Sequence, residues 1–286
     1  MPIRPVINNT RAPSHKIAKF LNTRLKNMEI LPNIYNIKNS LEIAEEISKI
    51  HINQHMRLIT LDIRDLYFNL PTQGIIQAAK FWLHKNAYNI EETKQIFTLP
   101  QTIMEQNYFQ YNNLFYKPKE GVAMGSPLSG TLAELYLQRI ENNYIKQCID
   151  SEEIYYYKRY VDDIIILFNI NKIQEEQLLQ GINHIEQNLT FKLTTEDNNK
   201  INFLGLTITR KISKLEIGIY RKETNTDTVI HYLSNHPTEQ KMTTFRCYIN
   251  RLATLPITQE EKTTEWTAIL NMAKNNAFPT YKIVRL

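Results

Sequence analysis

Apolar residues in the first half of the chain recur with helical spacing and then alternate, which predicts helices followed by a strand. In residues 14–26 they return every three or four positions, as one face of an amphipathic helix requires. A second helix is expected from Asn39, because Asn39 and Glu42 have the spacing of a capping box. Residues 56–63 alternate between apolar and polar side chains, so they predict a strand that ends at Asp62.

The second half of the chain mixes helical spacing with short apolar runs. Residues 154–168 consist of two apolar runs separated by a tight turn, which predicts a β-hairpin. Helices are expected over residues 73–110, after the glycine-rich turn at 121–130, over 175–188 and over 237–286, with further strands over 191–195 and 202–209. This order of elements predicts an α+β fold in which helices pack behind an antiparallel sheet.

Acidic residues fall where the predicted strands end. Asp62 closes the first strand, and Asp162 and Asp163 lie in the turn of the predicted hairpin. Taken singly, each is more commonly structural, since Asp is favoured in turns and helix caps. Adjacent carboxylates repel one another, and one takes up a proton unless a cation compensates. Because Mg²⁺ binds through a few carboxylates, water and phosphate, the set together predicts a divalent-metal site for phosphoryl transfer.

Glycine is unevenly distributed along the chain. Of seven glycines, Gly121, Gly125 and Gly130 fall within ten residues. A chain poor in glycine needs it where the backbone bends sharply or approaches a ligand closely. The loop also precedes a predicted helix, whose N-terminal amides favour phosphate. A plain helix-entry loop is the structural alternative.

Several isolated residues suit nucleotide chemistry, although each also has a structural interpretation. Tyr67, five residues after the first aspartate, could lie beneath a sugar or simply pack in the core. Arg4 could clamp a triphosphate through its planar guanidinium, or remain a surface residue. Lys200 is a candidate proton donor to pyrophosphate, with Lys192 as the alternative.

Composition narrows the class of protein without deciding the function. A length of 286 residues, 42% hydrophobic and 22% charged, is ordinary for one large or two modest globular domains. The net charge of +5 suits a phosphate-bearing partner but is common in other proteins. Cys148 and Cys247 lack zinc or disulfide-framework spacing, which favours a reducing compartment. The apolar run 164–168 is too short to span a bilayer and the N-terminus lacks a signal-peptide core, so we expect a soluble intracellular protein.

In their order along the chain, these residues resemble the motif series of reverse transcriptases. The acidic turn at 160–163 is the most specific element. Residues 220–227 and 231–241 resemble the thumb of Penelope-like retroelements, a telomerase-related group whose animal members often carry a helix-turn-helix-like stretch here. The other matching segments are the fingers motif at Arg4, the first palm motif at 61–68, the template- and nucleotide-contacting loop at 121–129, and the last palm segments with the primer grip at 191–197 and 202–208.

The resemblance implies an RNA-directed DNA polymerase that joins dNTPs to a DNA primer along an RNA template. Two Mg²⁺ ions, with Mn²⁺ as an alternative, would be held by Asp62, Asp162 and Asp163. A nuclear location is expected, without membrane attachment. The remaining implied roles are a sugar gate at Tyr67, a triphosphate contact at Arg4, nucleotide contacts at Ala123, Met124 and Gly125, and a primer grip at Leu204 and Gly205.

The implied architecture is a right-hand polymerase with an antiparallel-sheet palm, truncated fingers and a helical thumb. The fingers are expected to be truncated because the chain begins almost at their motif, and it stops before any GIY-YIG-type endonuclease domain. The first palm motif looks closer to retroviral or gypsy-type enzymes than to the usual Penelope version. The expected domains are a reverse transcriptase domain over 1–215, with partial fingers at about 1–55 and 73–118 and palm at about 56–72 and 119–215, and a helix-turn-helix-like thumb over 216–286.

Two other functions remain open at this point. An inactive retroelement remnant would bind nucleic acid in a salt-dependent way without polymerising. A group II intron-type or retron-type polymerase is the second alternative, and the stretch 234–237 argues against it. The sequence does not indicate an oligomeric state.

Overall fold

The structure is a computed structural model that describes residue 6 and residues 9–86, 88, 90–185 and 187–286. The chain divides into two compact units. The first unit comprises residues 1–36 and 61–194, and the second comprises residues 37–60 and 195–286. Both contain helices and strands, so the predicted α+β class is confirmed.

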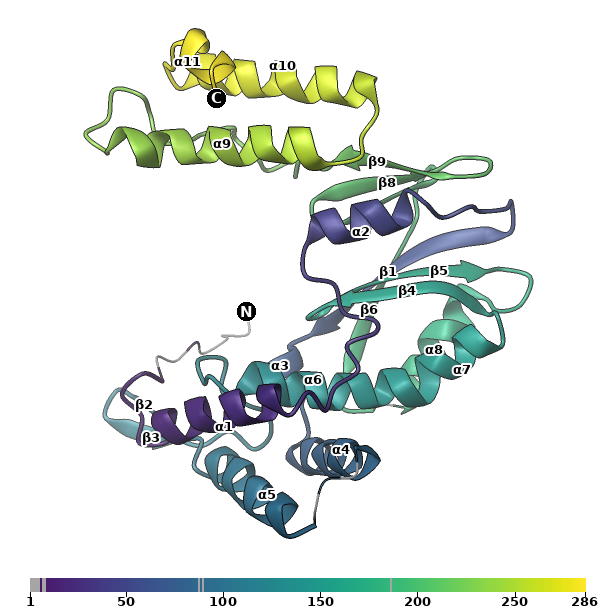
Figure 1. Ribbon diagram of the computed structural model, residues 1–286, viewed down its shortest axis with the longest axis vertical. Coiled ribbons are helices and arrows are strands. Elements are labelled where there is room, and N and C mark those ends of the chain that lie inside the picture. The colour runs from purple at the N-terminus through teal and green to yellow at the C-terminus, as the bar shows by residue number, and fades with distance from the viewer. Residues whose placement is uncertain (1–5, 7–8, 87, 89, 186) are drawn as a thin grey trace. The chain divides into compact units, whose positions relative to one another are not determined.

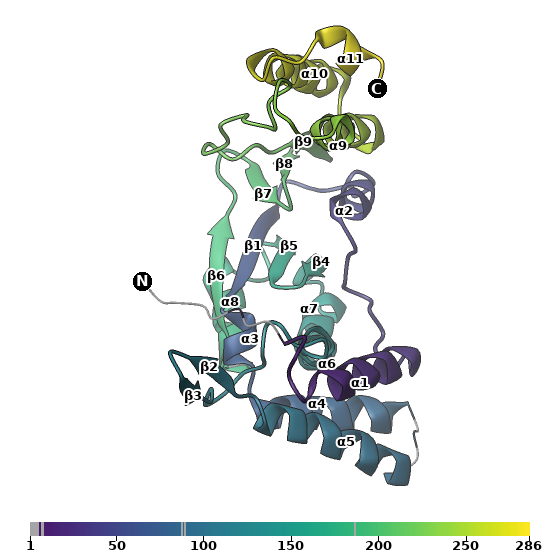
Figure 2. The same ribbon diagram turned by 90° about the vertical axis from the view of Figure 1, so that its left-hand side faces the viewer.

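Helices of the first unit pack against one another in a layer. The layer is formed by α1 (His15–Asn27), α4 (Thr72–Lys85), α5 (Ile90–Glu105) and α6 (Ser129–Ile140). Figures 1 and 2 show α4 and α5 side by side. Helix α1 buries Ala18, Leu21 and Leu25, the apolar face that its spacing predicts, whereas Ile17 lies exposed. Helix α6 continues through a π-helical turn, η1 (Glu141–Ile145), into α7 (Lys146–Asp150).

A four-stranded sheet carries the predicted hairpin. Its strand order is β4 (Ile154–Tyr160), β5 (Asp163–Asn169), β1 (Met56–Arg64) and β6 (Thr190–Thr195). The first two strands pair antiparallel, and residues 164–168 of β5 are fully buried. Tyr160 pairs with Asp163, so the turn consists of Val161 and Asp162 alone, with Asp163 as the first residue of β5. The first unit also contains α3 (Leu66–Asn69) and α8 (Glu175–Ile185).

The second unit combines one capped helix, an antiparallel sheet and a helical C-terminal part. The Asn39 side chain accepts hydrogen bonds from the N–H groups of Leu41 and Glu42, which starts α2 (Ser40–Ile47) as predicted. A core around Phe245 and Phe278 joins the last helices, and Figure 1 shows α9 beside α10. The other elements are β7 (Lys200–Phe203), β8 (Leu206–Arg210), β9 (Leu215–Ile219), α9 (Thr238–Thr254), α10 (Gln259–Asn275) and α11 (Thr280–Val284).

The helices predicted over residues 73–110 are confirmed as α4 and α5, but the prediction is wrong at the C-terminal end of that range. Helix α4 ends at Lys85, and β2 (Phe109–Tyr111) and β3 (Leu114–Tyr116) form a hairpin where the prediction had a helix end and a loop. Asn112 and Asn113 have φ of 49° and 61°. Because a two-residue hairpin turn of type I′ needs positive φ at both positions, Asn is one of the few residues that suit it.

The single strand predicted over residues 202–209 is also wrong. Leu204 and Gly205 have φ of 46° and 73°, so they turn the chain between β7 and β8. Strand β9, which the sequence did not predict, completes this sheet. Throughout the described ranges, no helix has both the length and the apolar character needed to cross a bilayer.

Replacing Phe168 with alanine tests whether the buried residues of β5 stabilise the first unit. Phe168→Ala removes a ring that is 0% exposed and should lower the free energy of unfolding by about 3–5 kcal/mol. The matched control is Phe20→Ala on α1, where the ring is 64% exposed and the change should stay within about 0.5 kcal/mol. Urea denaturation followed by circular dichroism measures both, and equal losses would contradict this account of the core.

Candidate active site

The backbone places Asp62 beside the acidic turn. Asp62 is exposed on β1, between the buried Leu61 and Ile63, so it belongs to a strand and caps no helix. The N–H of Ile63 donates a hydrogen bond of 3.0 Å to the carbonyl oxygen of Asp162. Residues 62 and 162, a hundred positions apart in the sequence, therefore lie on neighbouring segments, at the ends of the adjacent interior strands β1 and β5.

Tyr67 follows on α3, and a close backbone contact fixes its position. The N–H of Val122 donates to the carbonyl oxygen of Tyr67 at 2.7 Å. Gly121 has φ +88°, and a Cβ there would lie 2.5 Å from the carbonyl oxygen of Phe68 and 2.6 Å from that of Tyr67. Only glycine fits such an approach. Burial raises the pKa of the Tyr67 phenol, and the nearby Asp162 carboxylate raises it further, so the hydroxyl stays protonated at neutral pH.

The loop that contains Ala123, Met124 and Gly125 continues from this contact into α6. The carbonyl oxygen of Ala123 accepts hydrogen bonds from the Ser126 N–H at 3.0 Å and from the Ser129 hydroxyl at 2.6 Å. All three predicted contact residues are half-buried. The fold brings the loop next to Tyr67, but the glycine that the geometry requires is Gly121.

The three remaining candidates are one residue outside the described ranges and two exposed lysines. Arg4 lies outside the described residues. Lys192 is exposed on β6 of the first unit. Lys200 is exposed at the start of β7, in the second unit.

The predicted primer grip forms the turn between β7 and β8 in the second unit. Leu204 and Gly205 occupy its two positive-φ positions. The carbonyl oxygen of Gly205 accepts a hydrogen bond from the Tyr220 N–H at 2.9 Å and another from the Arg251 guanidinium of α9. This turn is thus held from two sides within its own unit.

Asp62, Asp162 and Asp163 offer carboxylate oxygens, the ligands that hard divalent cations prefer. Asp62 is exposed and the other two are half-buried, so water and phosphate can reach them. Across the described residues, no three Asp, Glu, His or Cys side chains lie close enough together to enclose an ion. Mg²⁺ commonly binds through one or two carboxylates and completes its shell with water and substrate phosphates. The residues therefore fit a cation by ligand type, without a preformed cage of three carboxylates.

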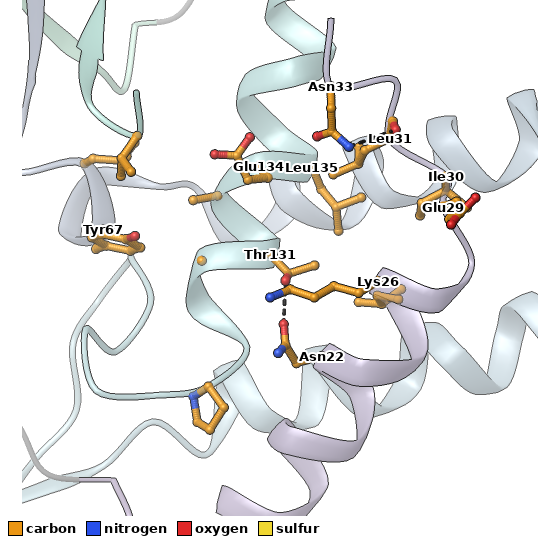
Figure 3. Close-up of a pocket in the computed structure, with 16 residues that line it drawn as sticks. Asn22, Lys26, Glu29, Ile30, Leu31, Asn33, Tyr67, Thr131, Glu134 and Leu135 are labelled. Atoms are coloured by element: carbon orange, nitrogen blue, oxygen red, sulfur yellow. Dashed lines mark hydrogen bonds between the residues drawn. The ribbon is translucent and has the colours of Figure 1, made fainter. Parts of the chain in front are cut away.

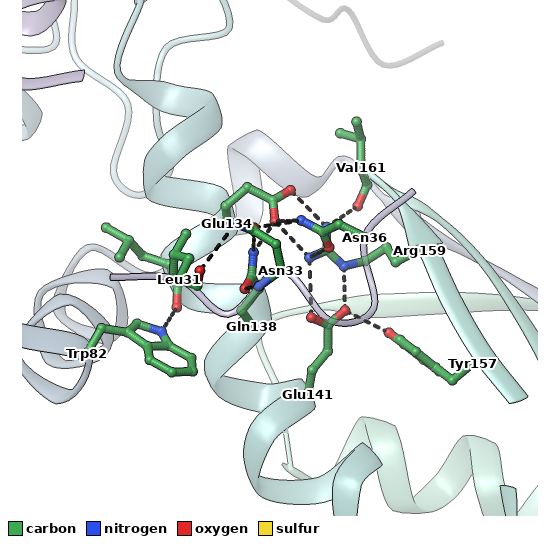
Figure 4. A network of polar contacts seen from close by, with 11 residues as sticks. Leu31, Asn33, Asn36, Trp82, Glu134, Gln138, Glu141, Tyr157, Arg159 and Val161 are labelled. Atoms are coloured by element: carbon green, nitrogen blue, oxygen red, sulfur yellow. Dashed lines mark hydrogen bonds and ion pairs between the residues drawn. The ribbon is translucent and has the colours of Figure 1, made fainter. Parts of the chain in front are cut away.

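A buried guanidinium supports the acidic turn from below (Figure 4). Arg159 of β4 is 1% exposed, and its Nε donates to Glu141 at 2.6 Å. Its terminal nitrogens donate to both oxygens of Glu134 at 2.9 Å and to the side-chain oxygen of Asn36 at 2.8 Å. One of them also donates to the carbonyl oxygen of Val161 at 3.1 Å. Since Val161 directly precedes Asp162, the network fixes the turn that carries the carboxylates.

Within this network, burial and ion pairing shift the pKa of each group in opposite directions. Burial alone would lower the pKa of Arg159, but Glu141 and Glu134 hold that pKa well above its usual value. Burial raises the pKa of Glu141 above its ordinary value, although Arg159 opposes the shift. For Glu134, burial also favours the neutral acid, but hydrogen bonds from Arg159 outweigh it and lower the pKa. Arg159 therefore stays charged.

The sequence prediction missed this network. A visible signal did exist, because Arg159 lies two positions after the buried Tyr157 on the inward face of β4, and Glu134 and Glu141 lie seven residues apart in a largely buried helical segment. Seven residues are about two helical turns, so both carboxylates face the same way. What no local pattern reveals is that Arg159 is their common partner.

A cavity of 730 Å³ borders the turn within the first unit (Figure 3). Tyr67, Val161 and Glu134 line it on one side. On the other side, Asn22 of α1 faces Thr131 of α6, and the two side chains form a hydrogen bond of 2.5 Å. The volume of the cavity lies within the range of small-molecule sites, about 300–1,000 Å³. A ligand there would contact Tyr67 directly.

Removing the guanidinium tests the network. Arg159→Met leaves Glu141 buried without its cation and should lower the free energy of unfolding by about 3–5 kcal/mol at neutral pH. The matched control is the same substitution at the exposed Arg64 of β1, where little change is expected.

The same pair of variants gives a pH test. Burial raises the pKa of Glu141 in the folded state, so the folded chain binds this proton more tightly than the unfolded chain does. The difference in stability between Arg159→Met and Arg64→Met should therefore shrink as the pH falls from neutral towards about 4.3, the ordinary Glu value. A difference that stays constant in urea titrations at each pH would show that Glu141 is not the stranded charge.

Family profiles match nearly the whole chain. Residues 2–234 match the family described as reverse transcriptase (RNA-dependent DNA polymerase). Residues 228–285 match the animal helix-turn-helix domain. No curated protein sequence matches the chain significantly.

Solved polymerase structures share the fold at low sequence identity. Telomerase from Candida albicans, in complex with a fragment of telomeric RNA, aligns with a TM-score of 0.59 and 13% identity over 96% of this chain and 50% of that one. Apo telomerase from Candida tropicalis aligns with a TM-score of 0.56 and 13% identity over 96% and 52%. The RNA-dependent RNA polymerase of a human picobirnavirus aligns with a TM-score of 0.54 and 10% identity over 91% and 50%. The chain thus spans about half the length of each of these proteins.

These alignments show a mixed α+β polymerase-like fold. Reverse transcriptases act on nucleic acids and use divalent metals, and the acidic turn has the ligand type that such metals require. The profile match extends over residues 2–234 of 286, well beyond half of the sequence. The chain therefore belongs to the reverse transcriptase family.

Proposed function

We propose that this chain is an RNA-directed DNA polymerase that extends a DNA primer along an RNA template with dNTPs. The observation that carries the proposal is the hydrogen bond between Ile63 and Asp162, which puts Asp62 next to the acidic turn. Family membership supports the reaction class. Tyr67 and Val161 line the same cavity, which supports a nucleotide next to the acidic turn.

The carboxylates would hold the metal ions. Asp62 and Asp162, on adjoining segments, would each contribute oxygens to two Mg²⁺ ions, and Asp163 at the start of β5 would assist. When bound, such a pair of ions supplies charge stabilisation at the attacking and leaving oxygens of an in-line displacement. The chain's own contribution is the rigid turn, because Arg159 holds Val161 through its carbonyl oxygen. A turn fixed in this way keeps Asp162 at one position during substrate binding.

Tyr67 would act as the sugar gate. The close contact at Gly121 fixes the backbone of Tyr67, and from this position its ring would clash with an incoming 2′-hydroxyl. Ala123, Met124 and Gly125 would contact the nucleotide from the loop that follows. Lys200, with Lys192 as the alternative, would donate a proton to pyrophosphate, and Arg4 would contact the triphosphate. Leu204 and Gly205 would guide the primer.

The C-terminal helices support a narrower assignment. Residues 228–285 match an animal helix-turn-helix domain, and the segments 220–227 and 231–241 resemble the thumb of Penelope-like retroelements. We therefore assign the chain to such an element, with residues 216–286 as the thumb and a nuclear location. The Candida albicans telomerase aligned here holds RNA, which supports an RNA template.

Asp162→Asn tests the catalytic assignment. Loss of a charged metal ligand should lower dTTP incorporation on poly(rA)/oligo(dT) with Mg²⁺ about a hundred-fold or more, which corresponds to about 2.7 kcal/mol of barrier. Asp150→Asn, at the exposed end of α7, is the matched control and should retain activity. An active wild type whose Asp162→Asn variant keeps its rate would refute the site. A wild type that binds primer–template in a salt-dependent way but never incorporates would support the inactive-remnant alternative instead.

Tyr67→Ala tests the sugar gate. With the ring removed, the preference for dTTP over UTP on poly(rA)/oligo(dT) should fall about ten-fold or more, because the steric clash with the 2′-hydroxyl is lost. Tyr67→Phe keeps the ring and should keep the preference. Competition assays with both nucleotides measure the ratio. If alanine leaves it unchanged, Tyr67 is a packed aromatic with no role in selection.

A further inference from the structure

The β2–β3 hairpin presents an aromatic face that the proposed reaction does not use. Phe109 pairs with Tyr116, and Tyr111 pairs with Leu114. Because side chains alternate across a strand, these four lie on the same face of the hairpin. The rings of Phe109 and Tyr116 stack, with centroids 5.4 Å apart and planes 18° apart. Figure 2 shows the hairpin at the edge of the first unit.

Most of this face is open to solvent. Tyr111 is 65% exposed, Leu114 is 60% exposed and Tyr116 is 40% exposed. On the opposite face, Phe115 is 75% exposed. A two-stranded hairpin is marginally stable without packing, and contiguous exposed apolar patches usually mark a binding site. The exposed face of the hairpin is therefore available to bind a partner.

Positive charge at the base of the hairpin identifies the kind of partner. Tyr108 directly precedes β2 and Lys117 directly follows β3, so by the same alternation both continue the face of Phe115, at the end of the hairpin where Phe109 and Tyr116 stack. The Lys117 ammonium lies 5.4 Å from the centroid of the Tyr108 ring, and Tyr108 is 53% exposed. Lys119, two residues on, is also exposed. Rings that stack on bases, beside cations that pair with phosphates, are the features by which proteins bind single-stranded nucleic acid. An apolar protein surface would gain nothing from the lysines.

The hairpin is also tethered closely to the acidic turn's neighbourhood. The N–H of Gly121 donates to the carbonyl oxygen of Leu70 at 3.1 Å, and the carboxylate of Glu120 accepts from the Thr72 N–H at 3.1 Å. Only residues 117–120 separate β3 from this anchor. Five residue steps from Tyr116 to Gly121 span at most about 18 Å, so the Tyr116 end of the hairpin lies within a few nucleotides of the Tyr67 segment.

We propose that the face formed by Phe109, Tyr111, Leu114 and Tyr116 binds unpaired template nucleotides by base stacking, with Lys117 and Lys119 on their phosphates. The inference rests on the proposed function for the identity of the strand as an RNA template. The stacking face would hold template bases before they reach the acidic turn. It would not contact paired duplex, whose bases are already stacked on one another.

Binding of two RNA–DNA hybrids tests this face. Fluorescence anisotropy in EDTA compares oligo(dT) annealed to a longer labelled oligo(rA), leaving about six unpaired nucleotides, with a blunt hybrid. Tyr111→Leu with Tyr116→Leu should weaken binding of the overhang hybrid about 25-fold, at about five-fold for each lost ring. Binding of the blunt hybrid should stay within about two-fold.

Matched variants separate stacking from general hydrophobicity. Tyr111→Phe with Tyr116→Phe keeps the rings and should bind the overhang like the wild type, while the leucine variant keeps apolar surface and should not. Ile212→Ser, at a 93% exposed apolar position of the second unit, should have no effect. Equal overhang binding by the leucine and phenylalanine variants would overturn the proposal. So would a wild-type dimer in sedimentation velocity that the leucine variant dissociates, since the face would then bind a second copy.

Primer extension by the wild type, measured in parallel, separates this inference from the proposed function. Extension together with ring-independent overhang binding refutes the stacking face alone. Ring-dependent overhang binding without extension supports the face and refutes the polymerase assignment.

Discussion

The acidic turn depends on one buried cation. Arg159 donates from all three of its guanidinium nitrogens, to Glu134, Glu141, Asn36 and the carbonyl oxygen of Val161. Burying such a charge is costly unless its partners are complete, so the carboxylates and the turn oxygen must be present together. The planar fork matches this set of acceptors, which a lysine ammonium could not satisfy in the same geometry. The position of the acidic turn thus depends on the protein groups that surround the Arg159 guanidinium.

Two backbone features show how tightly the site is constrained. Val161 has φ +55°, a conformation that is strained for a β-branched residue. It persists because Arg159 binds its carbonyl oxygen and strand pairing closes on either side. Gly121 is constrained by space instead, because the carbonyl oxygens of Tyr67 and Phe68 leave no room for a side chain. The strained backbone at Val161 and the close backbone contact at Gly121 together limit the space around Tyr67.

Features that depend on residues close together in the sequence could be predicted, and features that depend on distant residues could not. The buried face of α1 and the buried run of β5 depend on spacing within a few residues, so both were predictable. The β2–β3 hairpin was missed because its strands are three residues long and its Asn112–Asn113 turn lacks the usual glycine. The adjacency of Asp62 and Asp162 was expected from motif order. The role of Arg159 was not, because its partners come from three separate parts of the chain.

The separation of those partners has a consequence for how the chain matures. Asn36 and Arg159 are 123 positions apart, and the neighbouring hydrogen bond from the Gln138 side chain to that of Asn33, also drawn in Figure 4, joins residues 105 positions apart. Contacts of such long range form late, since a large loop must close before any of their stabilisation is gained. A nascent chain emerging from the ribosome can fold α1 and α4 early, but it cannot shape the acidic turn until β4 has been synthesised. Chains released before that point would therefore lack the acidic turn and the network that holds it.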